Sequence, residues 1–197
     1  YLVRKGWRTF ISYDQTSGWT SQQSNMVRVM TDGRCGVYSV LEQIDEINVL
    51  YLLHHRYPEM GKFQFSCMGK KPLVNGSNWC YNCDKCFRMT AFSLACNINP
   101  RLIGLDPALF YPKKVQNWAY FDQGERDYAD WDMDFAVYTL YKRGKKSPYI
   151  DMFLKKRIKE IPSKKELLDY FLNLRPAKNL PPGLEKKITS IISGELA

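Results

Sequence analysis

The stretch Phe65-Ser-Cys-Met-Gly-Lys-Lys-Pro-Leu-Val-Asn-Gly-Ser-Asn-Trp-Cys-Tyr-Asn-Cys-Asp-Lys-Cys-Phe-Arg88 holds four of the six cysteines of this chain. Two residues lie between Cys80 and Cys83 and two between Cys83 and Cys86, and a loop of twelve residues separates Cys67 from this group. The loop is polar and has little prospect of burying a core of its own. Four thiolates around one Zn²⁺ would supply the missing folding energy, because structural zinc prefers tetrahedral sulfur coordination. The spacing therefore predicts a zinc site with four ligands: Cys67, Cys80, Cys83 and Cys86.

Three other interpretations of these cysteines stay open. An iron–sulfur cluster also favours cysteines two residues apart and could recruit Cys96, although nine residues separate Cys96 from Cys86. A disulfide framework suits a shorter chain with fewer apolar residues. Unrelated reduced thiols would not show such regular spacing. Zinc is favoured, in a structural role, because four sulfurs leave no open position for a water molecule.

The composition indicates one sizeable domain with an appendage. The 197 residues are 45% hydrophobic and 14% aromatic, which is enough to bury a substantial core. No apolar run reaches the roughly 18 residues of a membrane span, so we expect no membrane partner. The first residues lack the apolar stretch of a signal peptide, and Tyr1 is not a natural start, so we expect further residues upstream. Free cysteines then favour a reducing, cytoplasmic location.

The positive charge is concentrated in the last quarter of the chain. Residues 1–141 carry 15 Lys and Arg against 14 Asp and Glu, whereas residues 142–197 carry 14 against 6. This asymmetry favours an acidic partner for the C-terminal segment, nucleic acid above all. A solvated basic surface that aids solubility explains the same charge equally well. The oligomeric state is not indicated.

Hydrophobic periodicity predicts short strands and helices in the first hundred residues. Ser39 followed by Glu42 is a capping-box pattern, and the apolar spacing that follows is helical. His54 and His55 would end this helix as surface residues rather than metal ligands, because cations suit a helix C-terminus. The expected elements are strands at 7–13 and 26–30 around a polar loop at 14–25, a helix at 40–55, a strand at 61–66 and a helix at 87–96.

The second half of the chain changes from acidic to basic. Six carboxylates are crowded together and could bind Mg²⁺, but an exposed acidic helix face is favoured, with Trp131, Phe135 and Tyr138 turned inward. From Lys142 onward a linker and three short helices, at 149–161, 163–174 and 183–192, are expected as a basic helical appendage. The six carboxylates are Asp122, Glu125, Asp127, Asp130, Asp132 and Asp134.

The order of these elements resembles the C-terminal half of the PP-loop ATP pyrophosphatases. A Ser-Val-Leu-x-x-Ile helix is followed by Phe65-Ser-Cys67 and then by Trp79-Cys-x-x-Cys-x-Lys-Cys-Phe-Arg88. This order is similar to the 7-cyano-7-deazaguanine synthase and muramoyl-dipeptide glutamate epimerase branches. The resemblance covers roughly residues 31–96 and implies that the four cysteines are zinc ligands. It implies an α/β fold: a partial Rossmann-like (adenine nucleotide alpha hydrolase-like) domain at 1–141, a zinc knuckle at 65–96, and the helical appendage at 142–197.

The family's function would be ATP- and Mg-dependent activation of a small acid or modified-base precursor, with release of pyrophosphate. Lys85 and Arg88, beside the zinc site, would meet the anionic substrate, although such cations as often neutralise thiolates. The chain departs from the family in three respects. The phosphate loop of the family is absent from this sequence, Val40 stands where proline is usual, and Glu46 stands where lysine is usual. No catalytic residue is assigned.

The alternative function is a non-catalytic, zinc-stabilised nucleic-acid-binding module. Trp79 and Tyr81 would stack on bases, while Lys70 and Lys71 would meet phosphates together with the cations beside the zinc site. The basic C-terminal segment would add affinity that is independent of sequence and falls with salt.

Overall fold

The structure is a computed structural model that describes residues 2–4, 7–9, 16–67, 79–111, 131–156, 158, 165, 171 and 173–197. The chain divides into two compact units, one formed by Asp45–Asn173 and the other by Tyr1–Ile44 with Leu174–Ala197. The segment expected as one appendage at 142–197 is thus shared between both units. Its first part stays with the larger unit because α7 (Pro148–Lys156) packs against α6 (Trp131–Lys142).

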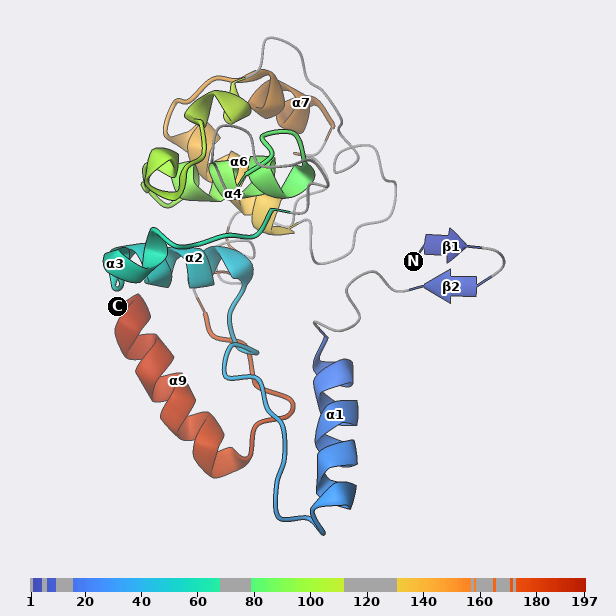
Figure 1. Ribbon diagram of the computed structural model, residues 1–197. Helices are drawn as coiled ribbons and strands as arrows, with labels where there is room; N and C mark the ends of the chain where they lie inside the picture. Colours follow the sequence, from blue (N-terminus) through green and yellow to red (C-terminus); the bar gives the residue numbers. More distant parts are fainter. Residues whose placement is uncertain are drawn as a thin grey trace. The chain divides into compact units, whose positions relative to one another are not determined.

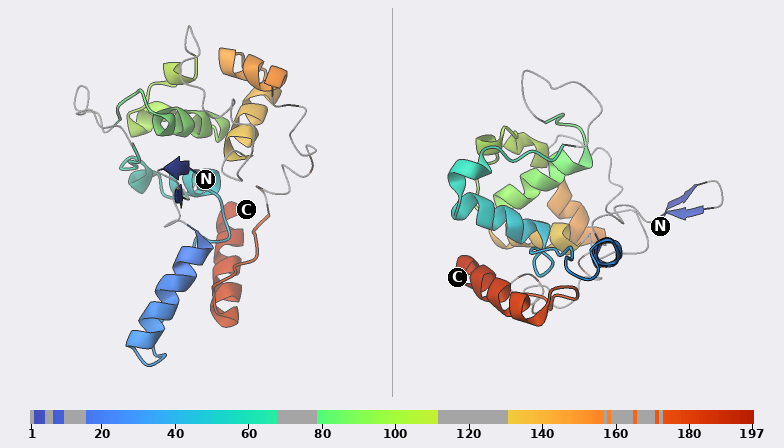
Figure 2. Two further views of the ribbon diagram at one scale, coloured as in Figure 1. Left: turned by 90° about the vertical axis from the view of Figure 1, so that its right-hand side faces the viewer. Right: turned by 60° about the horizontal axis from the view of Figure 1, so that its bottom comes forward.

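Helix α4 (Asp84–Ala95) is the helix against which the larger unit packs. It contacts α6, α2 (Glu46–His55) and two short 3₁₀ helices (Figure 1). Figure 2 shows the same group of helices from two further directions. The unit also contains α3 (Pro58–Gly61), η3 (Pro100–Ile103) and η4 (Pro107–Phe110). The core they enclose is apolar, and its largest side chains include Leu50, Phe92, Phe110, Met133 and Phe153.

The ends of α4 follow from its sequence. Cys83 takes the N-cap position, and the helix ends where Asn97 adopts a left-handed conformation with φ of 62°. The Ile98 N–H then donates to the Ser93 carbonyl, which is the hydrogen bond of a Schellman C-cap. Two buried hydroxyls, those of Thr90 and Ser93, donate to carbonyls one turn earlier, so α4 buries no unsatisfied hydroxyl there.

The expected α/β, Rossmann-like fold is wrong. The regular elements of the described residues are helices, apart from an antiparallel pair of three-residue strands, β1 (Leu2–Arg4) and β2 (Trp7–Thr9), in the smaller unit. Residues 26–30, expected as a strand, are the last turn of α1 (Ser17–Met30). Residues 61–66, expected as a strand, are the last residue of α3 followed by a turn and irregular chain. In both places the preference for β-structure is overridden, because no neighbouring strand is there to pair with it in the described part of the chain.

Helix α2 begins later than the capping-box pattern predicts. Its first residue is Glu46, with Asp45 at the N-cap position, whereas Val40 and Leu41 lie in a turn and are about half exposed. The Glu42 carboxylate is engaged elsewhere, since it accepts hydrogen bonds from the backbone and side chain of Asn179. The C-terminal end of α2 at His55 agrees with the prediction.

The smaller unit holds α1 and α9 (Pro182–Leu196), which covers the helix expected at 183–192. Asn179 connects its parts: the side-chain amide donates to the Ser17 carbonyl at 2.9 Å and to the Glu42 carboxylate at 3.1 Å. Gln43 exchanges hydrogen bonds with the Thr189 hydroxyl on α9. In neither unit do the described residues form a helix with the length and apolar character needed to cross a membrane.

Candidate metal centre

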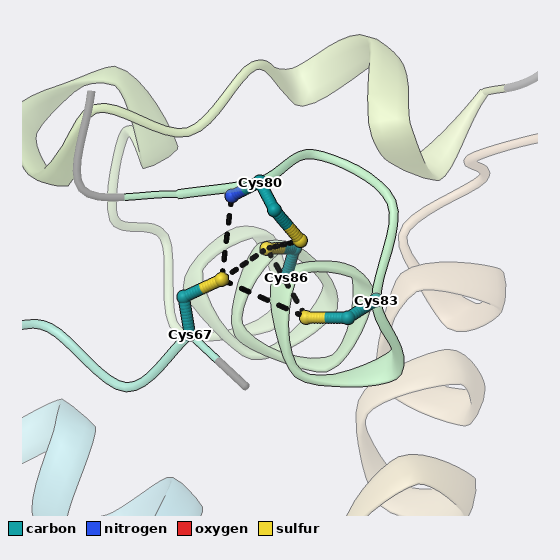
Figure 3. Close-up of side chains that lie close together, drawn as sticks. All are labelled: Cys67, Cys80, Cys83 and Cys86. Atoms are coloured by element: carbon teal, nitrogen blue, oxygen red, sulfur yellow. Dashed lines mark hydrogen bonds between the residues drawn. The ribbon is translucent and has the colours of Figure 1, made fainter. Parts of the chain in front are cut away.

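The sulfurs of Cys67, Cys80, Cys83 and Cys86 converge on one point at the N-terminal end of α4 (Figure 3). All four sulfurs lie within 4.8 Å of one another, and four of the pairs are 3.5 to 3.9 Å apart. A tetrahedron with metal–sulfur bonds of about 2.3 Å has edges of about 3.8 Å. The four sulfurs are therefore close enough to hold one metal ion, with every corner of a tetrahedron supplied by the chain.

The backbone around the cysteines hydrogen-bonds to their sulfurs. The Cys80 N–H donates to the Cys67 sulfur at 3.3 Å (Figure 3). The Asn82 backbone donates to the Cys80 sulfur, and the Tyr81 backbone donates to the Cys86 sulfur. Tyr81 is in the left-handed region, with φ of 55°, which lets the chain turn tightly between Cys80 and Cys83. These donors stabilise negative charge on the sulfurs, as does the N-terminal end of α4.

Burial acts in the opposite direction on the thiols. It raises the pKa of Cys86 and of Cys80 above the ordinary value, and the neighbouring thiols raise the pKa of Cys86 further. A metal ion binds the thiolate form and displaces the proton. The site is thus arranged so that positive charge at its centre is needed to hold four ionised sulfurs together.

Trp79 and Tyr81 fasten the cysteine segment to the helical core. Trp79 is fully buried, and its indole N–H donates to the Ile103 carbonyl. The Tyr81 hydroxyl donates to the Gly104 carbonyl at 2.7 Å. Trp79 has no exposed ring face for stacking on a base, so the structure gives it a packing role instead. Lys70 and Lys71, the other residues expected to bind nucleic acid, lie outside the described residues.

Lys85 and Arg88 form ion pairs with carboxylates from two other helices. Lys85 pairs with Glu46, and the Arg88 guanidinium lies 3.3 Å from Glu46 and 2.9 Å from Asp132. The Arg88 side chain is only 12% exposed and also lies over the Phe92 ring. These cations, expected to meet an anionic substrate, instead join α2, α4 and α6 beside the cysteines. Glu46 is the common partner of both cations.

The acidic face of α6 is buried, and the expectation of an exposed face is wrong for the two carboxylates that the structure describes there. Asp132 is 5% exposed and Asp134 is 2% exposed. Met133, Ala136 and Val137 of α6 are buried as well, and Arg88 on α4 supplies the counter-charge of Asp132. Burial raises the pKa of Asp132 to about 7; Arg88 opposes the shift, while Asp45 and Glu46 add to it. The other acidic residues of the expected cluster are outside the described residues.

Glu46 and Asp132 are the site residues that the sequence reasoning missed. One signal was present: two cations flank a cysteine ligand on a helix, and partly buried cations require counter-charges. The partners could not be identified from the sequence, because Glu46 is 39 residues from Lys85 and Asp132 is 44 residues from Arg88.

The remaining candidate ligands lie away from the cysteine cluster. Cys96 is ten residues beyond Cys86 along α4, which corresponds to about 15 Å of helix, so it does not join the four sulfurs. His54 and His55 occupy the last turn of α2, as expected. The His55 ring nitrogen lies 2.9 Å from the Cys96 carbonyl, and that of His54 lies 2.8 Å from the Gln64 side chain.

Comparison of the chain with family models, with curated proteins and with solved structures finds no match. The resemblance to PP-loop ATP pyrophosphatases therefore stays a prediction from the sequence.

Proposed function

We propose that the four cysteines hold one zinc ion as a structural centre, and that the chain is a zinc-stabilised nucleic-acid-binding module rather than an enzyme. The observation that carries the zinc assignment is the set of four cysteine sulfurs within 4.8 Å of one another. An all-thiolate tetrahedron is a preferred environment of structural zinc, and it leaves no position for a substrate or a reactive water.

The surroundings of the cysteines support a structural role. Cys67 follows α3, Cys80 follows the buried Trp79, and Cys86 is in the first turn of α4. One ion bound to all four sulfurs would join these segments at the end of α4. The ion pairs of Lys85 and Arg88 then connect the same end of α4 to α2 and α6. Metal binding and packing of the larger unit are thereby coupled.

The distribution of charge supports nucleic acid as the partner. The cations beside the cysteines are paired with carboxylates, so they add little positive potential to the surface. Lysines of residues 142–197 are in contrast exposed, Lys142, Lys145 and Lys146 among them. Exposed lysines that meet phosphates release counterions, which gives affinity without sequence preference.

The ATP-dependent function implied by the family resemblance gains no support from the geometry. Its phosphate loop would stand at the edge of a parallel sheet, and the described residues contain no such sheet. Lys85 and Arg88, assigned to the anionic substrate, are engaged by Glu46 and Asp132.

The test combines binding and thermal stability on the zinc-loaded chain. Fluorescence anisotropy with a short single-stranded RNA is expected to show binding that weakens steeply between roughly 50 and roughly 200 mM salt. ATP with Mg²⁺ is expected to leave the melting temperature unchanged. A rise in melting temperature with ATP, together with no binding of RNA or of single-stranded DNA, would contradict the proposed function.

A further inference from the structure

The C-terminal end of α4, opposite the metal centre, gathers basic and aromatic side chains from separate segments. The Arg143 guanidinium donates to the carbonyls of Leu94 and Ala95, at 3.3 and 2.6 Å. The His55 ring nitrogen lies 2.9 Å from the carbonyl of the next residue, Cys96. Side chains from the end of α2 and from the turn after α6 therefore contact three successive carbonyls at the C-terminal end of α4.

The turn after α6 presents further cations at this end of α4. Lys142, Lys145 and Lys146 are all exposed, and Arg143 between them is anchored as described. Gly144 has φ of 72°, and the Lys145 N–H donates to the Leu140 carbonyl, so the turn is a Schellman C-cap with a defined conformation. The cations are thus held on an ordered turn between α6 and α7.

Two partly exposed tyrosines belong to the same two segments, α2 and the end of α6. Tyr141, in the last turn of α6 and next to Lys142, is 40% exposed. Tyr51 is 36% exposed, and its ring centroid is 4.4 Å from that of His55. Partly exposed aromatic rings beside cations are the combination that binds single-stranded nucleic acid, since the rings stack on bases and the cations meet phosphates.

We propose that this surface, formed by Tyr51, His55, Tyr141, Lys142, Arg143, Lys145 and Lys146, is the contact surface for single-stranded nucleic acid. The inference rests on the proposed function and gives it a location. The surface lies at the C-terminal end of α4, about 18 Å along this twelve-residue helix from the cysteine segment that the sequence indicated for nucleic-acid binding. Unlike Lys85 and Arg88, whose charges are balanced by carboxylates, the lysines of this surface lie in solvent.

Charge reversal at the turn tests the location. In the variant Lys142→Glu/Lys145→Glu/Lys146→Glu, Arg143 is left unchanged because it also caps α4. We expect the affinity for single-stranded RNA to fall at least about tenfold, and the slope of log K against log salt to decrease by about 2, since each lost contact to a single strand removes about 0.7. The matched control, Lys178→Glu/Lys186→Glu/Lys187→Glu, makes the same charge change on exposed lysines of the smaller unit and is expected to change the affinity by less than about threefold.

The variant Tyr141→Ser tests stacking separately. Loss of one base–aromatic contact is expected to weaken binding by about fivefold or more, without changing the salt slope. Circular dichroism and zinc content, expected to equal those of the unaltered chain, verify that each variant is folded.

The possible outcomes separate the two proposals. Failure of the unaltered chain to bind RNA or single-stranded DNA would refute the proposed function and this surface together. Binding that the control variant loses and the turn variant keeps would refute the surface alone. Equal binding of polyglutamate, or of phosphatidylserine vesicles, would show a general affinity for anions and would overturn nucleic acid as the partner.

Discussion

Replacing Asp132 by asparagine tests the buried charge network that connects α2, α4 and α6. The carboxyl is almost fully enclosed, and burial raises its pKa from 3.8 to about 7. The groups that face it are Arg88 from α4, and Asp45 and Glu46 from α2. Between these two pKa values the folded chain keeps a proton that the unfolded chain releases. Stability therefore falls as the pH rises from about 4 to about 7, and is level above and below this window.

The size of the effect follows from the shift. A displacement of about three pKa units, at about 1.4 kcal/mol each, gives about 4 kcal/mol as an upper limit for the stability lost across the window. Asparagine accepts the Arg88 hydrogen bond and has no proton to lose, so Asp132→Asn removes this contribution. Because pH 5 already lies inside the window, about two of the three pH units remain, and we expect the free energy of unfolding of the unaltered chain to fall from pH 5 to pH 8 by up to about 3 kcal/mol relative to the variant.

The assay is urea denaturation followed by circular dichroism, at pH 5 and pH 8, with zinc present for both proteins. The control variant is Asp151→Asn, which removes an exposed carboxylate on α7 and is expected to keep the pH profile of the unaltered chain. Identical pH profiles for the unaltered chain and Asp132→Asn would refute the reasoning, because Asp132 would then carry no raised pKa in the folded state.

Three further substitutions test the core and the cysteine cluster. Cys86→Ser is expected to abolish stoichiometric metal binding and to lower the melting temperature, whereas Cys96→Ser should keep the metal, as measured by elemental analysis. Phe92→Ala should lower the free energy of unfolding by about 3–5 kcal/mol, because the ring is fully buried, whereas Phe63→Ala, at a 70% exposed position, should change it by less than about 0.5 kcal/mol in urea titrations. Gly61→Ala should lower the free energy of unfolding by about 1–3 kcal/mol, because the new methyl group would lie 2.6 Å from a ring nitrogen of His54. An unchanged urea midpoint would show that the histidine ring can move aside.

The parts of the chain that could be predicted from the sequence are those with local signals. The spacing of Cys67, Cys80, Cys83 and Cys86 predicted their convergence, because metal ligands must meet at one point. The apolar periodicity before Cys96 predicted most of α4. Both signals are contained in short segments, so no distant partner was needed to interpret them.

The failures lie where distant residues decide the outcome. Glu42 matched a capping box, but it accepts hydrogen bonds from Asn179, 137 residues away, and α2 begins at Glu46 instead. Asp132 matched a solvated acidic face, but Arg88 on another helix lets it be buried. Residues 26–30 are rich in β-formers, yet they continue a helix that Thr16 caps through its hydroxyl. The α/β expectation failed for the same reason. It rested on local β-preferences and on a resemblance over a third of the chain, and neither determines which distant residues pair.

The most direct measurement is the metal content of the purified chain, determined by native mass spectrometry before and after treatment with a strong chelator, with circular dichroism recorded in parallel. We expect one zinc ion per chain, a cooperative loss of helical signal on its removal, and recovery when zinc is returned. A chain that contains no metal, one that holds an iron–sulfur cluster, or one that keeps its helical signal and melting temperature after the zinc is removed would contradict the central claim.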